Sequence, residues 1–257
     1  MKKNAYLITL VTVTVCCVIA GSCWHIFKWG FSFMESFMPF VFSESEKEQP
    51  GSLSSKDTLL DEFTSISADV SMMDIDIVSG DEYSLSYSAH EKLAPKFEVK
   101  NSCLEITQKP AKNFWGRKTC SVTITVPGEL SSVYLDMSAG DIDLNGITAD
   151  RLDIDVSAGD LDISDCKLGD AFVDASTGDI DFLNTEFDKL EIDASIGDIQ
   201  VDAAEDLSDY KIKLDTSLGD VDVNGRDYKD CFFQNAGEDG RKSLTIDTST
   251  GDIELNY

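Results

Sequence analysis

The chain has 257 residues, with 48 acidic and 21 basic side chains and a formal charge of −27 at pH 7. Residues 133–257 hold 32 of the acids and nine of the bases, so the acidity belongs to the C-terminal half. A surface this negative repels phosphate backbones, which excludes nucleic-acid binding as the main activity. The 42% hydrophobic share, with 14 Phe and seven Tyr, also argues against a disordered acidic tail and indicates a folded region.

Residues 5–27 form an uncharged, largely apolar run behind Lys2 and Lys3. As a helix this run is about 34 Å long at ~1.5 Å per residue, which is enough to cross a bilayer. Positive flanks stay on the cytoplasmic side, so residues 1–4 are expected to be a cytoplasmic tail and the bulk of the chain extracytoplasmic. Two alternatives stay open, a lipoprotein that is lipidated at Cys23 and a cleaved signal peptide.

Residues 28–62 are interpreted as an aromatic juxtamembrane segment followed by a linker. The part from 28 to 42 carries six aromatic side chains, an enrichment typical of a membrane interface. It either lies on the bilayer or docks another membrane protein. Residues 43–58 are polar, contain Pro and Gly, and are typical of a linker.

A repeat of about nineteen residues organises the rest of the chain. Six segments align without gaps, and their glycines are Gly140, Gly159, Gly178, Gly197, Gly219 and Gly251. The spacings are 19, 19, 19, 22 and 32 residues, and we interpret the last two as loop insertions on a regular frame. A seventh copy at residues 66–77 has Met73 in the glycine position and is interpreted as an atypical terminal unit.

The repeat alternates with period two. Counted from the glycine, apolar residues fall at positions −7, −5, +2 and +4, and acids fall at −4, +1 and usually +3. This predicts a strand, a tight corner at Ser-x-Gly, where glycine suits a positive φ, and a second strand. Equal spacing predicts one coil per repeat, stacked in sequence order at ~4.8 Å, with rows −5 and +2 as interior ladders.

The expected fold class is therefore all-β. It is a β-solenoid that resembles a parallel β-helix, with coils of about 19 residues over residues 63–257, preceded by one N-terminal transmembrane helix. A β-sandwich of hairpins is the rival fold. Further alternating runs between residues 83 and 126 predict additional strands.

The aspartates that follow the corner glycines are the candidate cation ligands: Asp141, Asp160, Asp179, Asp198, Asp220 and Asp252. Stacked carboxylates ~4.8 Å apart repel by about 0.9 kcal/mol per pair in water, so an attraction must offset the repulsion. In one interpretation, the aspartates and the corner serines accept hydrogen bonds from corner amides. These serines are Ser138, Ser157, Ser176, Ser195, Ser217 and Ser249. In the other, the carboxylates bind Ca²⁺, although neither a glycine-rich nonapeptide nor an EF-hand loop is present.

A basic loop interrupts the acidic chain. From residue 90 to residue 118 there are seven bases and three acids. The candidate contacts with anionic lipid or with a partner's acidic groove are Phe114, Trp115, Arg117 and Lys118. The alternative is an ordinary hairpin tip whose aromatic side chains fold back on the sheet.

Catalysis is not expected. Two histidines, His25 and His90, leave no basis for most hydrolase triads and zinc sites. A glycan-cleaving β-helix needs a pair of acids apart from the repeat, and nearly every acid on these rows is a repeat position. We expect no cofactor other than the Ca²⁺ considered above. In the simplest hairpin register Cys120 lies opposite residues near Ile106, so no disulfide is predicted among Cys103, Cys120, Cys166 and Cys231.

The reiterated L-x-[ILV]-D-x-S-x-G-D-[ILV]-[DE] unit follows ITVPGELSSVYL at residues 124–135 and a single membrane segment. This arrangement resembles the bacterial putative-adhesin, or toast-rack, family of β-strand-repeat domains over about residues 60–257. The resemblance implies an all-β, solenoid-like, non-enzymatic domain with no catalytic residues to carry over, in a family that often accompanies cell-envelope stress systems. We therefore expect a single-pass protein of the bacterial cell membrane whose partner is a protein or a cell-envelope polymer. A Ca²⁺-stabilised solenoid that binds cell-wall polymer is the alternative.

Overall fold

The described part of the chain is all-β. The computed structural model describes residues 53–91, 93–109, 120–228, 231–235 and 242–257. Strands and no helix lie in these ranges, and among these residues no helix is long and apolar enough to cross a bilayer. The expected membrane segment, the tail before it, Cys23 and the aromatic part at residues 28–42 lie outside the described residues. The end of the segment that was interpreted as a linker differs from that interpretation, because Leu53–Leu59 form a strand that pairs with Ser84–His90.

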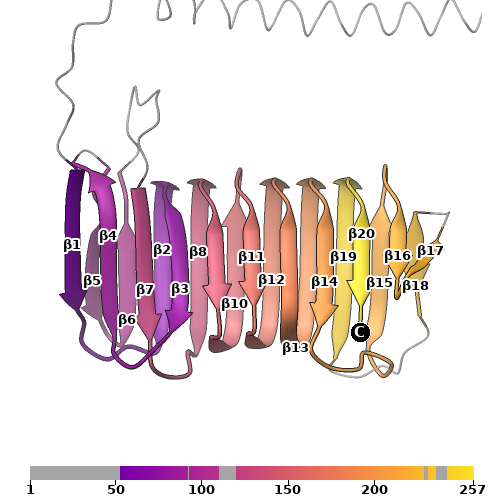
Figure 1. Ribbon diagram of the computed structural model, residues 1–257, viewed down its shortest axis with the longest axis horizontal. Helices are drawn as coiled ribbons and strands as arrows, with labels where there is room; N and C mark the ends of the chain where they lie inside the picture. The colour runs from indigo at the N-terminus through magenta and orange to yellow at the C-terminus, as the bar shows by residue number, and fades with distance from the viewer. Residues whose placement is uncertain (1–52, 92, 110–119, 229–230, 236–241) are drawn as a thin grey trace, which may run out of the picture. The chain divides into compact units, whose positions relative to one another are not determined.

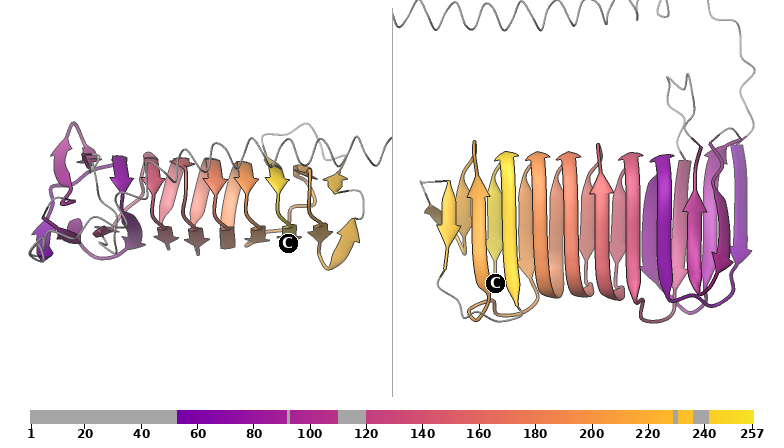
Figure 2. Two further views of the ribbon diagram at one scale, coloured as in Figure 1. Left: turned by 90° about the horizontal axis from the view of Figure 1, so that it is seen from above. Right: turned by 180° about the vertical axis from the view of Figure 1, so that it is seen from behind.

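The strands form two layers, which Figure 2 shows from above and Figure 1 from the side. Sheet A contains, in spatial order, β1 (Leu53–Leu59), β4 (Ser84–His90), β7 (Cys120–Val126), β3 (Asp74–Ser79), β9 (Ile142–Asn145), β11 (Leu161–Ser164), the first part of β13 (Ile180–Ile196), β14 (Ile199–Ala203), β20 (Ile253–Asn256), β16 (Val221–Val223) and β17 (Arg226–Tyr228). Sheet B contains β5 (Lys96–Lys100), β6 (Cys103–Thr107), β2 (Ser65–Met72), β8 (Ser132–Ala139), β10 (Thr148–Val156), β12 (Lys167–Thr177), the second part of β13, β19 (Ser243–Thr250), β15 (Lys211–Thr216) and β18 (Phe232–Gln234).

The repeats stack as parallel coils, as the spacing predicts. β8, β10, β12 and β13 pair in parallel, with Leu135 opposite Ile154 and Ile154 opposite Val173. At the corner the amide of Gly159 donates to the carbonyl of Thr177 in the next coil at 3.0 Å. Equivalent residues therefore meet in register, which excludes a sandwich of separate hairpins for this part of the chain.

The two expected interior ladders are present. Row −5 consists of Ala68, Leu135, Ile154, Val173, Ile192, Ile246 and Leu214, in spatial order, and row +2 of Ile75, Ile142, Leu161, Ile180, Ile199, Ile253 and Val221. No member is more than 3% exposed. Burying each large aliphatic side chain contributes about 1.5–3 kcal/mol, so these ladders stabilise the stack together with the equally buried rows at positions −7 and +4.

The last two repeats stack in the opposite order to the predicted one. β19 and β20 pair with β13 and β14 on one side and with β15 and β16 on the other. After β16 the chain turns back as β17 and β18, which pair antiparallel with β16 and β15. The interpretation of the long spacings as simple insertions is wrong, because the chain skips one position in the stack and fills it last. The C-terminal strands thereby gain a partner on each side, and short antiparallel strands form the exposed edge.

The copy at residues 66–77 is not a terminal unit, so that interpretation is also wrong. β2 lies between β8 and β6, and β3 lies between β9 and β7. The antiparallel strands β5, β4 and β1 then complete this end of the two sheets. The end of the stack is therefore built from β7, β4 and β1 in sheet A and from β6 and β5 in sheet B, which lack the corner motif.

Gln108 ends the row of corners with its side chain. Its Oε1 accepts hydrogen bonds from the amides of Ser71 and Met72 at 3.2 and 2.8 Å. Its Nε2 donates to the carbonyl oxygens of Met72 and Leu93 at 2.9 and 2.8 Å. The buried carboxamide thus replaces the peptide group that a further coil would supply, beside the corner where Met73 stands in the glycine position.

Each regular coil also turns at a second corner, which was not predicted from the sequence. Gly146, Asp165 and Asn184 occupy it in consecutive coils, with φ values of 67°, 54° and 50°. Gly, Asn and Asp adopt this left-handed conformation at the lowest cost, so their recurrence is the signal that locates the corner. Asn184 Nδ2 donates to Asp165 Oδ1 at 2.6 Å, which links adjacent coils.

Candidate functional site

The Ser-x-Gly corner brings the backbones of neighbouring coils into close contact. Left-handed φ values between +133° and +150° occur at Gly140, Gly159, Gly178, Gly197 and Gly251. A Cβ atom on Gly159 would lie 1.8 Å from the carbonyl oxygen of Gly140. Gly219 has a φ outside this range, yet its Cβ would lie 2.0 Å from the carbonyl oxygen of Gly251. Glycine is therefore required by the stacking as well as by the local conformation.

The aspartate after the corner glycine binds the backbone of the next coil, in every coil from Asp141 to Asp252 in spatial order. Asp141 Oδ1 accepts the amide of Asp160 at 3.0 Å, and Asp160 Oδ1 accepts the amide of Asp179 at 3.0 Å. The row continues through Asp198, Asp252 and Asp220 at 2.8–2.9 Å. These are bonds of the kind that the first interpretation of this row requires. Each contributes about 1.5–3 kcal/mol, more than the ~0.9 kcal/mol of repulsion between neighbouring carboxylates.

The corner serines do not take part in this network. They are exposed, and no hydrogen bond to their hydroxyl groups is found within the described residues. The hydroxyl groups of six corner serines thus lie on the edge of the stack without a hydrogen-bond partner among the described residues: Ser138, Ser157, Ser176, Ser195, Ser217 and Ser249. The backbone amides of Ser157 and Ser217 do pair with neighbouring coils, with the carbonyl oxygens of Met137 and Thr248 at 3.0 Å. Among the same described residues, no three His, Cys, Asp or Glu side chains form a group that could hold a metal ion.

The outer face of sheet B carries rows of equivalent side chains along the stack. The aspartate row, at position −4, consists of Asp69, Asp136, Asp155, Asp174, Asp193, Asp247 and Asp215. The mixed row, at position −6, consists of Ser67, Tyr134, Asp153, Phe172, Glu191, Thr245 and Lys213. The two rows are neighbours, since alternate residues of a strand point to the same face.

Basic side chains neutralise the acids of the mixed row. Arg151 Nη2 lies 2.6 Å from Asp153 Oδ2, and Lys189 Nζ lies 2.8 Å from Glu191 Oε2. Both bases stand at position −8, on the side of the mixed row that is away from the aspartate row. Arg151 and Lys189 thus compensate the acids of the mixed row and not those of the aspartate row.

The middle of the aspartate row has no such partners. At the C-terminal end, Lys213 Nζ lies 3.5 Å from Asp247 Oδ2 and 3.7 Å from Asp215 Oδ2. From Asp136 to Asp193, no ion pair is found within the described residues. Four consecutive coils therefore present an exposed carboxylate whose charge no basic side chain of this part of the chain compensates.

Two aromatic side chains lie in the mixed row, two coils apart. Tyr134 and Phe172 line a groove of about 380 Å³ on this face, together with residues of β10, β12 and β13. Tyr134 is 43% exposed. The carboxylate of Asp136 is the main cause that raises the pKa of the Tyr134 hydroxyl above its ordinary value. Neither residue was predicted as a site residue from the sequence, although an aromatic side chain at an outward position of the repeat was a signal.

The outer face of sheet A is also acidic. Its row at position +3 places Asp76, Asp143, Asp162 and Asp181 in adjacent coils. Burial, followed by the charge of Asp162, raises the pKa of Asp143 and of Asp181. These carboxylates are therefore held with like charges beside them and without sufficient compensation.

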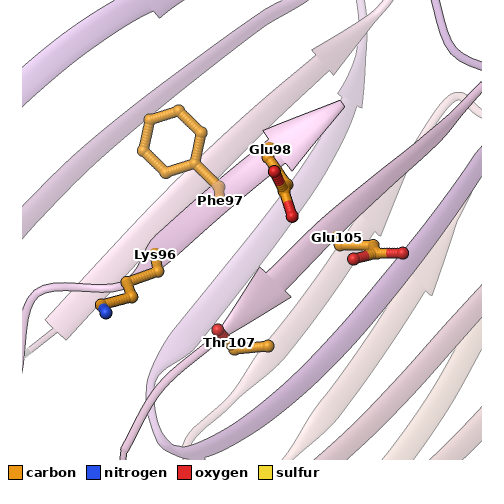
Figure 3. A pocket seen from close by; sticks show the side chains of 5 residues that line it. All are labelled: Lys96, Phe97, Glu98, Glu105 and Thr107. Atoms are coloured by element: carbon orange, nitrogen blue, oxygen red, sulfur yellow. The ribbon is translucent and has the colours of Figure 1, made fainter. Parts of the chain in front are cut away.

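The described part of the chain has two further grooves. One, of about 330 Å³, lies over β5 and β6, and Figure 3 shows its side chains pointing in different directions: Lys96, Phe97, Glu98, Glu105 and Thr107. The other, of about 270 Å³, lies at the second corners near Lys242 and Glu205.

A hydrogen-bonded network borders this second groove. Lys242 Nζ donates to Glu205 Oε2 at 3.0 Å and to Tyr210 Oη at 3.1 Å. Burial and the Glu205 carboxylate raise the pKa of Tyr210 to about 12, and hydrogen bonds with Tyr210 and Glu205 raise the pKa of Lys242. Burial alone would raise the pKa of Glu205, but its bonds to Tyr210 and Lys242 lower it. Each group thus keeps its ordinary charge state near neutral pH.

The cysteines of the described region are all free thiols: Cys103, Cys120, Cys166 and Cys231. The expected register of Cys120 opposite residues near Ile106 is wrong, because β7 and β6 lie in different sheets and Cys120 pairs with Ala89. Burial raises the pKa of the Cys120 thiol to about 11. The candidate contact residues of the basic loop lie outside the described residues: Phe114, Trp115, Arg117 and Lys118.

Stacked coils with a Ser-x-Gly-Asp corner, acidic outer faces and antiparallel ends characterise the described part of the chain. The chain belongs to the Toastrack DUF4097 family. The family model matches residues 63–256, which includes every copy of the repeat. A search of curated proteins found no matching relative of this Toastrack chain.

Solved structures similar to this Toastrack chain come from several bacteria. A "putative cell adhesion protein" of Clostridium sporogenes is 18% identical, with a TM-score of 0.47 over 80% of this chain and 99% of that chain. A "putative adhesin" of Bacteroides fragilis is 16% identical, with a TM-score of 0.47 over 81% and 99%. A "putative lipid binding protein" of Parabacteroides distasonis is 15% identical, with a TM-score of 0.31 over 80% and 94%.

Proposed function

We propose that this chain is a non-catalytic binding or scaffold protein, held in the bacterial cell membrane by residues 5–27, with its repeat domain outside the cytoplasm. The observation that carries the proposal is the outer face of sheet B. There, coils in register repeat an exposed carboxylate at every ~4.8 Å, beside an open groove that contains Tyr134 and Phe172. A flat face with repeated chemistry suits an extended partner such as a protein segment or a cell-envelope polymer.

The electrostatics of the described residues support a role without catalysis. A general acid or base works best when its pKa lies near the working pH. In the network of Glu205, Tyr210 and Lys242, the pKa values of the tyrosine and the lysine are raised and that of the glutamate is lowered. Each shift moves the group away from neutral pH, so the network serves to fasten the segment between β14 and β15 to the stack.

For the biological role, we propose adhesin-like binding or a part in cell-envelope stress signalling. Membership of the Toastrack family and the expected membrane segment both support a place in the cell envelope. The two roles differ in their readout. Deletion of the chain would change attachment of cells in the first case and the induction of a stress response in the second.

Photo-crosslinking in intact cells tests the proposal. A photoreactive residue at Ser157, on the edge of the aspartate row, is expected to capture a partner. The same residue at Asp162, on the outer face of sheet A, is the matched control and is expected to capture little. Protease added to intact cells is expected to digest the repeat domain and leave the membrane segment. Equal capture from both faces, or protection from the protease, would contradict the proposal.

A further inference from the structure

On the outer face of sheet B, one aromatic ring is covered by basic side chains of the chain itself. Phe172 has a basic residue at position −8 of the coil on either side, Arg151 in β10 and Lys189 in β13. The Arg151 Cζ lies 4.6 Å and the Lys189 Nζ lies 4.4 Å from the centroid of the Phe172 ring. Cations at this distance are attracted by the negative face of an aromatic ring.

The same position is open beside Tyr134. Asp153 pairs with Tyr134 on one side and with Phe172 on the other, so the two rings stand in one row. Relative to Tyr134, the position that Arg151 holds relative to Phe172 is occupied by Ser65, which carries no charge. The position that Lys189 holds relative to Phe172 is occupied by Arg151, whose guanidinium group lies over Phe172 and pairs with Asp153. Within the described residues, no cation lies over the Tyr134 ring.

Negative charge surrounds this open position. The carboxylates of Asp136, Asp155, Asp153 and Asp69 all act on the Tyr134 hydroxyl and raise its pKa. Of these, Asp153 is paired with Arg151, whereas Asp136 and Asp155 belong to the part of the aspartate row that has no basic partner among the described residues. A cation that enters from solution therefore finds a ring and unpaired carboxylates together.

We propose that Tyr134 and the aspartate row from Asp136 to Asp193 bind an extended basic peptide segment, with a Lys or Arg side chain over the Tyr134 ring. This inference rests on the proposed function, because it names the partner of the same face. Lys and Arg are the cations that already cover Phe172, and their long stems reach carboxylates that repeat at ~4.8 Å along the row. The charge of −27 also steers a basic segment towards the protein.

Binding of fluorescently labelled octalysine to the full chain, in lipid nanodiscs of neutral lipid, tests the proposal. We expect the double variant Asp136→Asn with Asp155→Asn to bind about tenfold more weakly, since two charge pairs are lost. Tyr134→Ala is expected to weaken binding about threefold and Tyr134→Phe hardly at all, because the ring and not the hydroxyl holds the cation. The matched control is Asp143→Asn with Asp162→Asn on sheet A, which removes the same charge and is expected to change the affinity less than about twofold.

Several outcomes would overturn the proposal. Absence of octalysine binding does so directly, and equal loss in the two double variants would show attraction to net charge alone. Tighter binding of an amine-bearing oligosaccharide of the same charge, lost in Tyr134→Ala, would assign the face to a glycan. In that last case, and whenever Ser157 captures a non-basic partner in cells, the proposed function stands and the peptide partner is wrong.

Discussion

At Gly178, the methyl group of an alanine would lie 1.8 Å from the carbonyl oxygen of Gly159, and the φ of +141° is one that alanine rarely adopts. We expect Gly178→Ala to lower the free energy of unfolding by about 3 kcal/mol or more, because the two coils must separate locally. Urea denaturation followed by circular dichroism measures this loss.

Gly225→Ala is the matched control for the corner glycine. Gly225 also has a left-handed φ, of +75°, but no heavy atom lies within 4 Å of the position of its Cβ. The expected loss is only about 1–2 kcal/mol, the cost of the left-handed conformation for a residue with a side chain. Equal losses at Gly178 and Gly225 would show that stacking adds nothing to the requirement for glycine.

The hydrogen bonds of Gln108 at the end of the row of corners stabilise the stack. Gln108→Ala would leave the amide of Met72 and the carbonyl oxygen of Leu93 without these buried hydrogen bonds, so we expect a loss of about 2–4 kcal/mol. Gln200→Ala is the control, since the bond from Gln200 to Asp202 lies on the outer face. Its expected cost is below about 1 kcal/mol. Thermal unfolding of both variants is the measurement, and a loss at Gln108 as small as at Gln200 would refute its role as a cap.

Among the elements, the row of acids on sheet A sets a dependence of stability on pH. The pKa of Asp181 is raised above its ordinary value of 3.8, so the folded protein binds more protons than the unfolded one between these two values. The contribution of Asp181 to the free energy of unfolding is then most favourable below the ordinary pKa, and it falls as the pH rises through the raised pKa. We expect Asp181→Asn to stabilise the domain at pH 7 by on the order of 0.5 kcal/mol, and less at pH 4, as measured by thermal unfolding at both pH values.

Asp170→Asn is the control for that substitution. Asp170 lies between Arg151 and Lys189 in the register of sheet B, so its charge has opposite charges beside it. Removal of this charge is expected to be neutral or destabilising at pH 7. Stabilisation by both substitutions would mean that net charge, and not the row on sheet A, governs the dependence on pH.

The order of the C-terminal strands is open to a direct chemical test. Ser195 and Ser249 lie at equivalent positions of β13 and β19, which are adjacent, whereas Ser217 belongs to the coil beyond. Adjacent coils are ~4.8 Å apart, within the Cα separation that a disulfide spans, and coils two steps apart are not. We expect the pair Ser195→Cys with Ser249→Cys to oxidise to a disulfide, and the pair Ser195→Cys with Ser217→Cys to stay reduced. Peptide mapping by mass spectrometry distinguishes the two orders, and the reverse result would restore stacking in sequence order.

For the molecule as a whole, the repeat motif predicted the individual coils. It did not predict which distant strands pair with each other. The corner at Gly159 and the interior ladder through Ile154 repeat with a fixed period, so a single coil is enough to recognise them. The position of the last coil depends on which strands pair, and any two copies offer each other the same apolar rows. Gln108 could not be predicted as a cap, because it does not belong to the repeat. Its hydrogen bonds to Met72 and Leu93 depend on the fold at the end of the stack. The repeat pattern does place Tyr134 at an outward position. The uncharged position beside its ring, however, depends on Ser65, which lies in a neighbouring coil.

The net charge of the whole molecule gives the last prediction, which concerns Ca²⁺. Asp141, Asp160, Asp179, Asp198 and Asp252 each use one oxygen to accept an amide of the next coil, whereas Ca²⁺ requires six to eight oxygen ligands. Ions act on this acidic protein mainly by screening, and we expect millimolar Ca²⁺ to raise the Tm no more than Mg²⁺ or NaCl of equal ionic strength. EDTA is expected to leave the Tm of the purified chain unchanged. A rise of more than about 5 °C with Ca²⁺ alone, reversed by EDTA, would contradict this prediction, since only an ion that binds the folded state specifically shifts the equilibrium in this way.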